Sequence, residues 1–147
     1  MIKISTEELP EGQFKVHGKV ELLKHSEEIL IFHATGPFNM ELLHALLTLE
    51  KVFLNELKSE GRQWAEVIIF EKNCMAVNEA ASKFPAYLDE LKSISLSPKA
   101  TAFVIGPNVE GLSRMKEHYE KSFRAAELEF AIFNCEQDAI AWVNQYL

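Results

Sequence analysis

The chain has 147 residues, of which 48% are hydrophobic, enough to enclose one core and too few for two, so a single domain over residues 1–147 is expected. Fifteen basic and 22 acidic residues give a net charge of -7, which repels a nucleic acid backbone and an anionic membrane surface alike. Nucleic acid is therefore not expected as a partner.

The sequence shows neither a targeting segment nor a membrane span. Its opening, MIKISTEELPEG, contains glutamates and no apolar segment, unlike a secretory signal. No later run approaches the roughly 20 apolar residues that cross a bilayer. Cys74 and Cys135 lie far apart and form no CxxC pair, which predicts two reduced thiols rather than a disulfide or a metal knuckle. These features predict a cytoplasmic protein.

The first part of the chain predicts a β-hairpin followed by a helix. Residues 14–23 alternate apolar and polar side chains, the period-two pattern of a half-buried strand. After a turn at 24–27, the run ILIFHAT at 29–35 is a second strand, close enough to pair antiparallel with the first. The pair at 36–37, glycine and proline, then stops this strand, and Asn39 is placed to cap a helix.

The helix predicted after Asn39 is long and amphipathic, and it ends at Glu60 and Gly61. Apolar side chains recur along it at helical spacing and charged ones supply much of the opposite, solvated face. The apolar stripe consists of Leu42, Leu46, Leu49, Phe53 and Leu57, and the solvated face of Glu41, Glu50, Lys51, Glu56 and Lys58.

Strands and helices alternate in the rest of the sequence. Residues 64–70 (WAEVIIF) are almost all apolar, as in a strand covered on both faces, and are the best candidate for the centre of the sheet. A helix follows, in which Pro85 marks either a kink or the start of a second short helix. Residues 100–105 (ATAFVI) repeat the strand pattern, and 106–108 (GPN) repeat the stop and cap. The next helical stripe contains Leu112, Met115, Tyr119 and Phe123.

The last strand covers residues 128–133 (LEFAIF), and Asn134 with Gln137 resembles a capping pair for a terminal helix. The order of elements is therefore β-β-α-β-α-β-α-β-α. A hairpin followed by alternating helices and strands predicts an α/β fold. Its mixed sheet has about five strands, the later ones parallel, with helices packed on it.

The terminal helix has two distinct faces. Ile140, Val143 and Leu147 lie within a narrow arc and are expected to face the core. Trp142 and Tyr146, four residues apart, form a neighbouring aromatic strip on a less buried face. The strip is either a partner-binding surface or a cover over the edge of the protein's own sheet, and the sequence leaves both interpretations equally open.

Several stretches carry a family resemblance. ATGPFN opens the first long helix, VIIFEKN closes the next strand, and LEFAIF followed by EQDAIAWVNQYL ends the chain. Over about residues 14–147 this pattern resembles the STAS domains (sulfate transporter and anti-sigma-factor antagonist), and its ending resembles the bacterial SpoIIAA-like group. The resemblance implies a non-enzymatic domain that binds a protein partner or a small ligand in the crevice between sheet and helices. The oligomeric state is left open, a homodimer included.

The resemblance is incomplete where STAS antagonists are regulated. In those domains the strand matching VIIF is followed by an aspartate and then by a phosphorylatable serine or threonine at a helix N-terminus, where the helix dipole favours the phosphate. Here the stretch is EKNCMAVNEAAS, with no serine or threonine between Phe70 and Ala81. The phosphorylation switch of the family therefore does not carry over directly.

The residues just after the predicted central strand are the candidate site, because α/β proteins often bind ligands where such strands end. These residues are Glu71, Lys72, Asn73 and Cys74. One interpretation is a small cysteine-dependent enzyme in which Cys74 is the nucleophile, Lys72 helps to lower the pKa of its thiol and a histidine is the base.

The alternative interpretation is structural, and it is favoured. Glu71 and Lys72 are then solvated loop charges, Asn73 a turn or cap residue, and Cys74 a small apolar side chain under the helix. The sequence contains no GxSxG or cysteine-protease signature, so no catalytic residue is assigned. Its five histidines show no HxxxH or HxH spacing, so no metal site and no cofactor are predicted.

Overall fold

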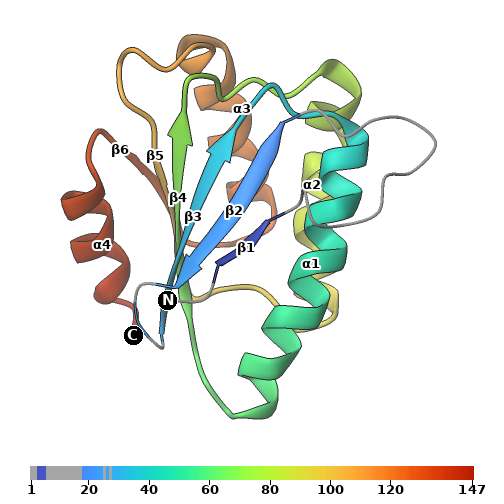
Figure 1. The fold of residues 1–147 in the computed structure, drawn as a ribbon, viewed down its shortest axis with the longest axis vertical. Coiled ribbons are helices and arrows are strands. Elements are labelled where there is room, and N and C mark those ends of the chain that lie inside the picture. The colour runs from blue at the N-terminus through green and yellow to red at the C-terminus, as the bar shows by residue number, and fades with distance from the viewer. Residues whose placement is uncertain (1–2, 6–17, 25, 27) are drawn as a thin grey trace.

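The computed structural model describes residues 3–5, 18–24, 26 and 28–147. Within them one mixed sheet contains six strands, which lie side by side in the order in which they occur in the sequence (Figure 1). The first three pair antiparallel and the last four parallel. They are β1 (Lys3–Ser5), β2 (Lys19–Lys24), β3 (Ile29–Thr35), β4 (Ala65–Glu71), β5 (Thr101–Val104) and β6 (Phe130–Phe133).

The predicted α/β fold is confirmed, with its hairpin β2–β3 and its parallel strands β3 to β6. β4 and β5 are adjacent as expected, with Val67 opposite Ala102. The short strand β1 was not predicted. Part of the first predicted strand, at 14–17, lies outside the described residues, as do residues 25 and 27 of the predicted turn.

Four helices cover the two faces of the sheet in the described part of the chain. α1, α2 and α3 lie on one face, and α4 lies on the other, over β3 to β6 (Figure 1). Their bounds are Met40–Ser59 for α1, Asn78–Ser93 for α2, Leu112–Ala125 for α3 and Glu136–Asn144 for α4.

The start of α1 and the course of α2 follow from local chemistry. The Asn39 side chain caps α1, as predicted, by accepting a 3.0 Å hydrogen bond from the backbone N–H of Leu42. Pro85 lies inside one continuous helix α2 and has no N–H to bond with the carbonyl of Ala81. His118 of α3 replaces that donor, because its Nε2 lies 2.7 Å from the Ala81 oxygen.

Two predicted caps were wrong. α3 begins after Gly111, not after Asn108, because the loop first pairs with the segment after β4: the Glu110 N–H donates to the Lys72 carbonyl at 2.8 Å. At α4 the N-cap is Cys135 rather than Asn134, and it makes no side-chain capping hydrogen bond. Long-range backbone pairing therefore moved the start of α3.

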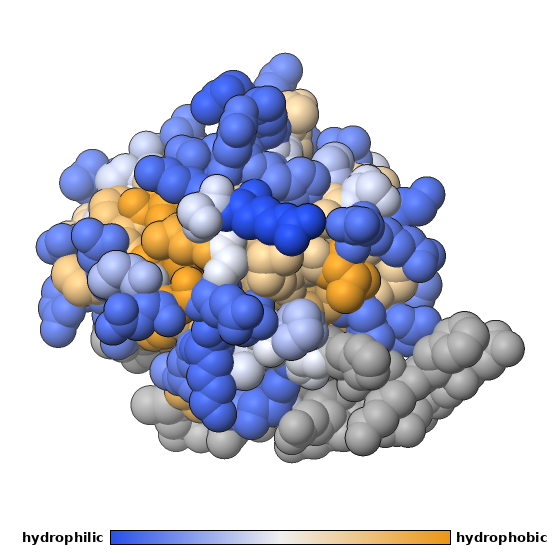
Figure 2. Space-filling model, turned by 90° about the horizontal axis from the view of Figure 1, so that it is seen from above, coloured by the Kyte–Doolittle hydropathy of each residue, from blue (hydrophilic) through white to orange (hydrophobic). Residues whose placement is uncertain are grey.

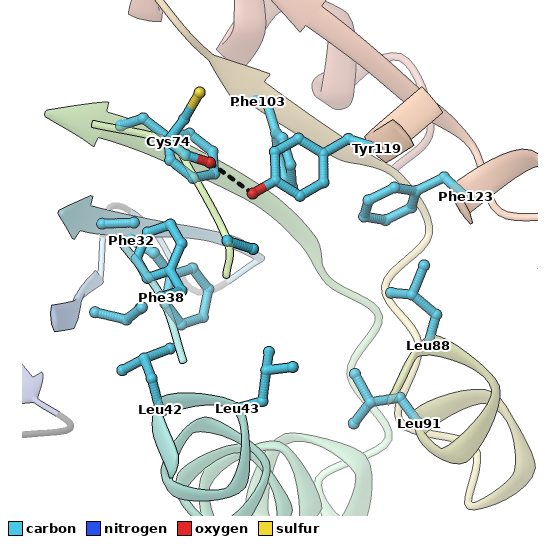
Figure 3. Close-up of a cluster of buried hydrophobic side chains, with 14 of the residues drawn as sticks. Phe32, Phe38, Leu42, Leu43, Cys74, Leu88, Leu91, Phe103, Tyr119 and Phe123 are labelled. Atoms are coloured by element: carbon cyan, nitrogen blue, oxygen red, sulfur yellow. Dashed lines mark hydrogen bonds between the residues drawn. The ribbon is translucent and has the colours of Figure 1, made fainter. Parts of the chain in front are cut away.

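The core has two layers, one on each face of the sheet. The larger lies under α1 to α3 and contains an aromatic cluster in which the Phe103 ring contacts several others (Figure 3). The smaller lies under α4, where Ala139 and Val143 are fully buried and Ile140 is half-buried. The prediction that Leu147 faces the core was wrong, because α4 ends at Asn144 and Leu147 is 36% exposed.

Candidate functional site

Hydrogen bonds fix the segment predicted as a site, residues 71–74, to the loops before α1 and before α3. Asn73 accepts a 2.7 Å hydrogen bond from the Met75 N–H with its side chain, and its carbonyl accepts one of 2.8 Å from the Gly36 N–H. This places Asn73 as a turn residue that joins the end of β4 to the loop before α1.

Cys74 is fully buried and its backbone is held at both ends. Its N–H donates to the Glu110 carbonyl at 2.9 Å, and its carbonyl accepts a 2.7 Å hydrogen bond from the Tyr119 hydroxyl (Figure 3). Burial raises the pKa of the Cys74 thiol, which disfavours the thiolate that a nucleophile needs. The geometry therefore supports the structural interpretation of this cysteine over the catalytic one.

The two charged residues of the segment are solvated. The Glu71 carboxylate accepts a 2.7 Å hydrogen bond from Nδ1 of His33 on β3, and both Glu71 and Lys72 are exposed. Figure 2 shows this end of the molecule, where the parallel strands finish. Its hydrophobic patches are separated by hydrophilic side chains.

The aromatic strip predicted at the end of the chain, Trp142 of α4 and Tyr146 just after this helix, lies away from this segment. Trp142 is half-buried, with its ring 5.7 Å from that of Phe133 on the edge strand β6 and 5.0 Å from that of Tyr146. Tyr146 is 37% exposed and donates a 3.3 Å hydrogen bond to Glu129. Because α4 covers the opposite face of the sheet and runs away from the end where the parallel strands finish (Figure 1), these two residues and the segment 71–74 do not form one site.

A cavity of about 100 Å³ lies between the sheet and α1, α2 and α3. Its walls come from one face of the sheet and from the three helices that cover that face. Nearly all of them are apolar side chains that point into one region (Figure 3). Among them are Phe38, Leu43, Ala80, Leu88, Phe103 and Phe123.

Two buried glutamates also line this cavity, Glu50 from α1 and Glu66 from β4. They are 6% and 7% exposed. The hydroxyl of Tyr87 on α2 donates a 2.7 Å hydrogen bond to Oε1 of Glu50. Two carboxylate oxygens of the pair, Oε2 of Glu50 and Oε1 of Glu66, are buried and accept no hydrogen bond from any described residue. The Ser97 hydroxyl is also buried and has no hydrogen-bond partner among the described residues.

Burial changes the protonation of this pair. It raises the pKa of Glu50 to about 7, although the hydrogen bond from Tyr87 opposes the change. Burial and then the nearby charge of Glu50 raise the pKa of Glu66 well above its usual range. The indole of Trp64 opposes this second change, although its N–H is not close or straight enough for a hydrogen bond. The pair therefore holds protons at a pH where exposed glutamates are ionised.

Neither residue was predicted as a site residue from the sequence. The prediction that Glu50 lies on the solvated face of α1 was wrong. Leu43, seven residues before Glu50, and Leu54, four residues after it, are buried on the same side of the helix. Glu66 stood unremarked inside the apolar strand. A charged residue in a strand that is covered on both faces was the signal that could have identified it.

In the described part of the chain no group of three or more histidine, cysteine, aspartate or glutamate residues could hold a metal ion. None of its helices is both long and apolar enough to cross a membrane. Comparisons with protein-family models, with curated proteins and with solved structures gave no significant match.

Proposed function

We propose that this chain is a cytoplasmic, SpoIIAA-like (STAS-like) domain that acts without catalysis, by binding a small and mostly apolar ligand in the cavity between the sheet and α1 to α3. The cavity is the observation that carries the proposal. The order of elements and the parallel strands after the hairpin are those that the STAS resemblance implies, which supports the family part of it.

Unfilled apolar space in the cavity favours a ligand there. Side chains that face a void lose their dispersion contacts on that side. At roughly 24 cal/mol per Å³, a cavity of about 100 Å³ costs about 2 kcal/mol of folding free energy, which a molecule of matching shape recovers. An apolar cavity of about 150 Å³ in another protein takes up benzene, so the smaller volume of about 100 Å³ found here suits a ligand with no more than a single ring.

The walls provide apolar contacts from several elements, and one part of them lies close to solvent. Apolar contacts come from four strands and three helices, through residues such as Val20 of β2 and Phe123 of α3. Leu46 and Phe84 of the lining are only half-buried, so part of the wall formed by α1 and α2 lies close to solvent. A cysteine-dependent activity has no comparable support, because Cys74 is buried and its thiol pKa is raised.

The test is a titration of the full chain with toluene and with benzyl alcohol, monitored by ¹H–¹⁵N NMR. We expect chemical-shift changes at the cavity walls, and we expect Ala80→Leu to abolish them, because Ala80 is fully buried in the lining and the larger side chain fills the space. Ala86→Leu, on the exposed side of the same helix, is the matched control and should bind normally. If neither compound binds, or if folded Ala80→Leu still binds them, the proposal is wrong.

A further inference from the structure

We propose that this cavity, given the ligand-binding function proposed above, selects a small apolar molecule that carries a protonated amine, and that Glu50 and Glu66 hold the amine.

The geometry points to a ligand rich in hydrogen-bond donors. Glu50 and Glu66 come from different elements, a helix and a strand, and both line the same cavity. Each leaves one oxygen buried without a donor among the described residues. A buried acceptor that has lost its water and gained no partner raises the free energy of the fold, so such a group is usually paired. A protonated primary amine has three N–H donors and no acceptor, which complements this arrangement.

Of the described polar groups around the pair, only the Tyr87 hydroxyl donates a hydrogen bond to it, because the Trp64 indole N–H acts on Glu66 without forming one. The Tyr87 hydroxyl already donates its proton to Glu50, which leaves its oxygen as an acceptor. Ser97, before β5, adds a hydroxyl that has no described partner, and Thr101 of β5 stands opposite Glu66 in the sheet. No lysine, arginine or histidine is among the described residues of the lining.

The lysine next to Glu50 in the sequence is paired outside the cavity. Lys51, which follows Glu50 on α1, forms a 3.0 Å ion pair with Glu90 of α2, and both side chains are largely exposed. The two carboxyls therefore have no built-in counter-charge, and a cationic ligand would supply it. An anionic ligand finds no cation in the described lining and is repelled whenever a carboxyl of the pair ionises.

Binding of an amine should be coupled to proton release. Below about pH 7 the raised pKa values keep the pair protonated, whereas an ammonium group beside it favours an ionised carboxylate. The Tyr87 hydroxyl from α2 and the Trp64 indole act on the pair directly, and Ser97 and Thr101 also line the cavity. Burial raises the pKa of Tyr87, so its hydroxyl stays protonated in this range. Amine affinity should therefore rise as pH increases towards the Glu50 pKa of about 7 and then level off.

The experiment compares benzylamine, benzyl alcohol and benzoate, which have similar size and different head groups, by calorimetric titration of the full chain between about pH 5.5 and about pH 8. We expect benzylamine to bind about tenfold more tightly than benzyl alcohol at the upper pH. Below about pH 7 its binding should release protons, visible as a dependence of the binding heat on the ionisation heat of the buffer. Benzoate should bind most weakly. Benzyl alcohol should show no comparable pH dependence.

The variants Glu50→Gln and Glu66→Gln test the assignment without removing the apolar walls. Each should lose most of the preference for benzylamine and keep its affinity for benzyl alcohol, whereas Glu56→Gln, on the exposed side of α1, should behave like the natural protein. If benzyl alcohol binds as tightly as benzylamine, or if neither variant changes the preference, the amine selectivity is wrong and the cavity function stands. If none of the three compounds binds, both proposals fail.

Discussion

Glu50→Gln should make the protein more stable at neutral and alkaline pH. The substitution removes a buried carboxyl and retains the hydrogen bond from Tyr87, because the amide oxygen of glutamine accepts the same hydroxyl proton. In the native protein burial raises the pKa of Glu50 from 4.5 to about 7. Between these values the native state keeps a proton that the unfolded chain has released. The stabilisation linked to this proton is complete below about pH 4.5 and is lost as pH rises to about 7.

The size of the effect follows from the same interval. At roughly 1.4 kcal/mol for each pH unit between 4.5 and about 7, the natural protein loses roughly 3 kcal/mol of unfolding free energy by about pH 8. Glutamine does not titrate, so the variant avoids this loss. It also removes the charge that contributes to the raised pKa of Glu66, which adds to the gain.

The assay is urea unfolding at several pH values from about 4.5 to about 8, with tryptophan fluorescence as the signal. The difference in unfolding free energy between Glu50→Gln and the natural protein should grow in favour of the variant by roughly 3 kcal/mol across this range. Glu56→Gln changes the same residue type on the exposed side of α1 and should leave the pH dependence unaltered. A Glu50→Gln protein with the pH dependence of the natural one would refute the burial argument.

Three further predictions concern the segment after β4. Gly111→Ala should cost roughly 2 to 3 kcal/mol, because φ is +93° and the added carbon would lie 2.5 Å from Cγ of Met75, whereas Gly106→Ala meets no atom within 4 Å; equal urea midpoints would contradict this. Tyr119→Phe leaves the buried Cys74 carbonyl without its 2.7 Å hydrogen bond and should cost about 1 to 3 kcal/mol, and an unchanged midpoint would argue against it. The buried Cys74 thiol should react with a thiol reagent at about pH 8 only after denaturation, unlike the half-buried second cysteine, so two fast thiols in the folded protein would be the adverse result.

The sequence by itself determined the order and type of the main elements, because these depend on short-range regularities. Alternation predicted the strand β2, the run ILIFHAT predicted β3, and the apolar runs at 64–70 and 100–105 predicted the parallel pair β4 and β5. Asn39 was identified as a cap because a cap bonds to a backbone N–H only three residues away. Each of these signals lies within one element or at its border.

Only the tertiary structure decided which side chains share an environment. Glu50 was predicted to be solvated because the pattern of α1 alone does not show that α2 packs against it. Tyr87 of α2, which hydrogen-bonds to Glu50, lies 37 positions away in the sequence. The Tyr119 hydroxyl of α3 holds the carbonyl of the buried Cys74, and Gly111 begins that helix because its loop pairs with Lys72. A periodic pattern identifies a face of a helix or strand but not the element that packs against it. Burial, the raised pKa values and the cavity all depend on that packing, so local sequence patterns could not reveal them.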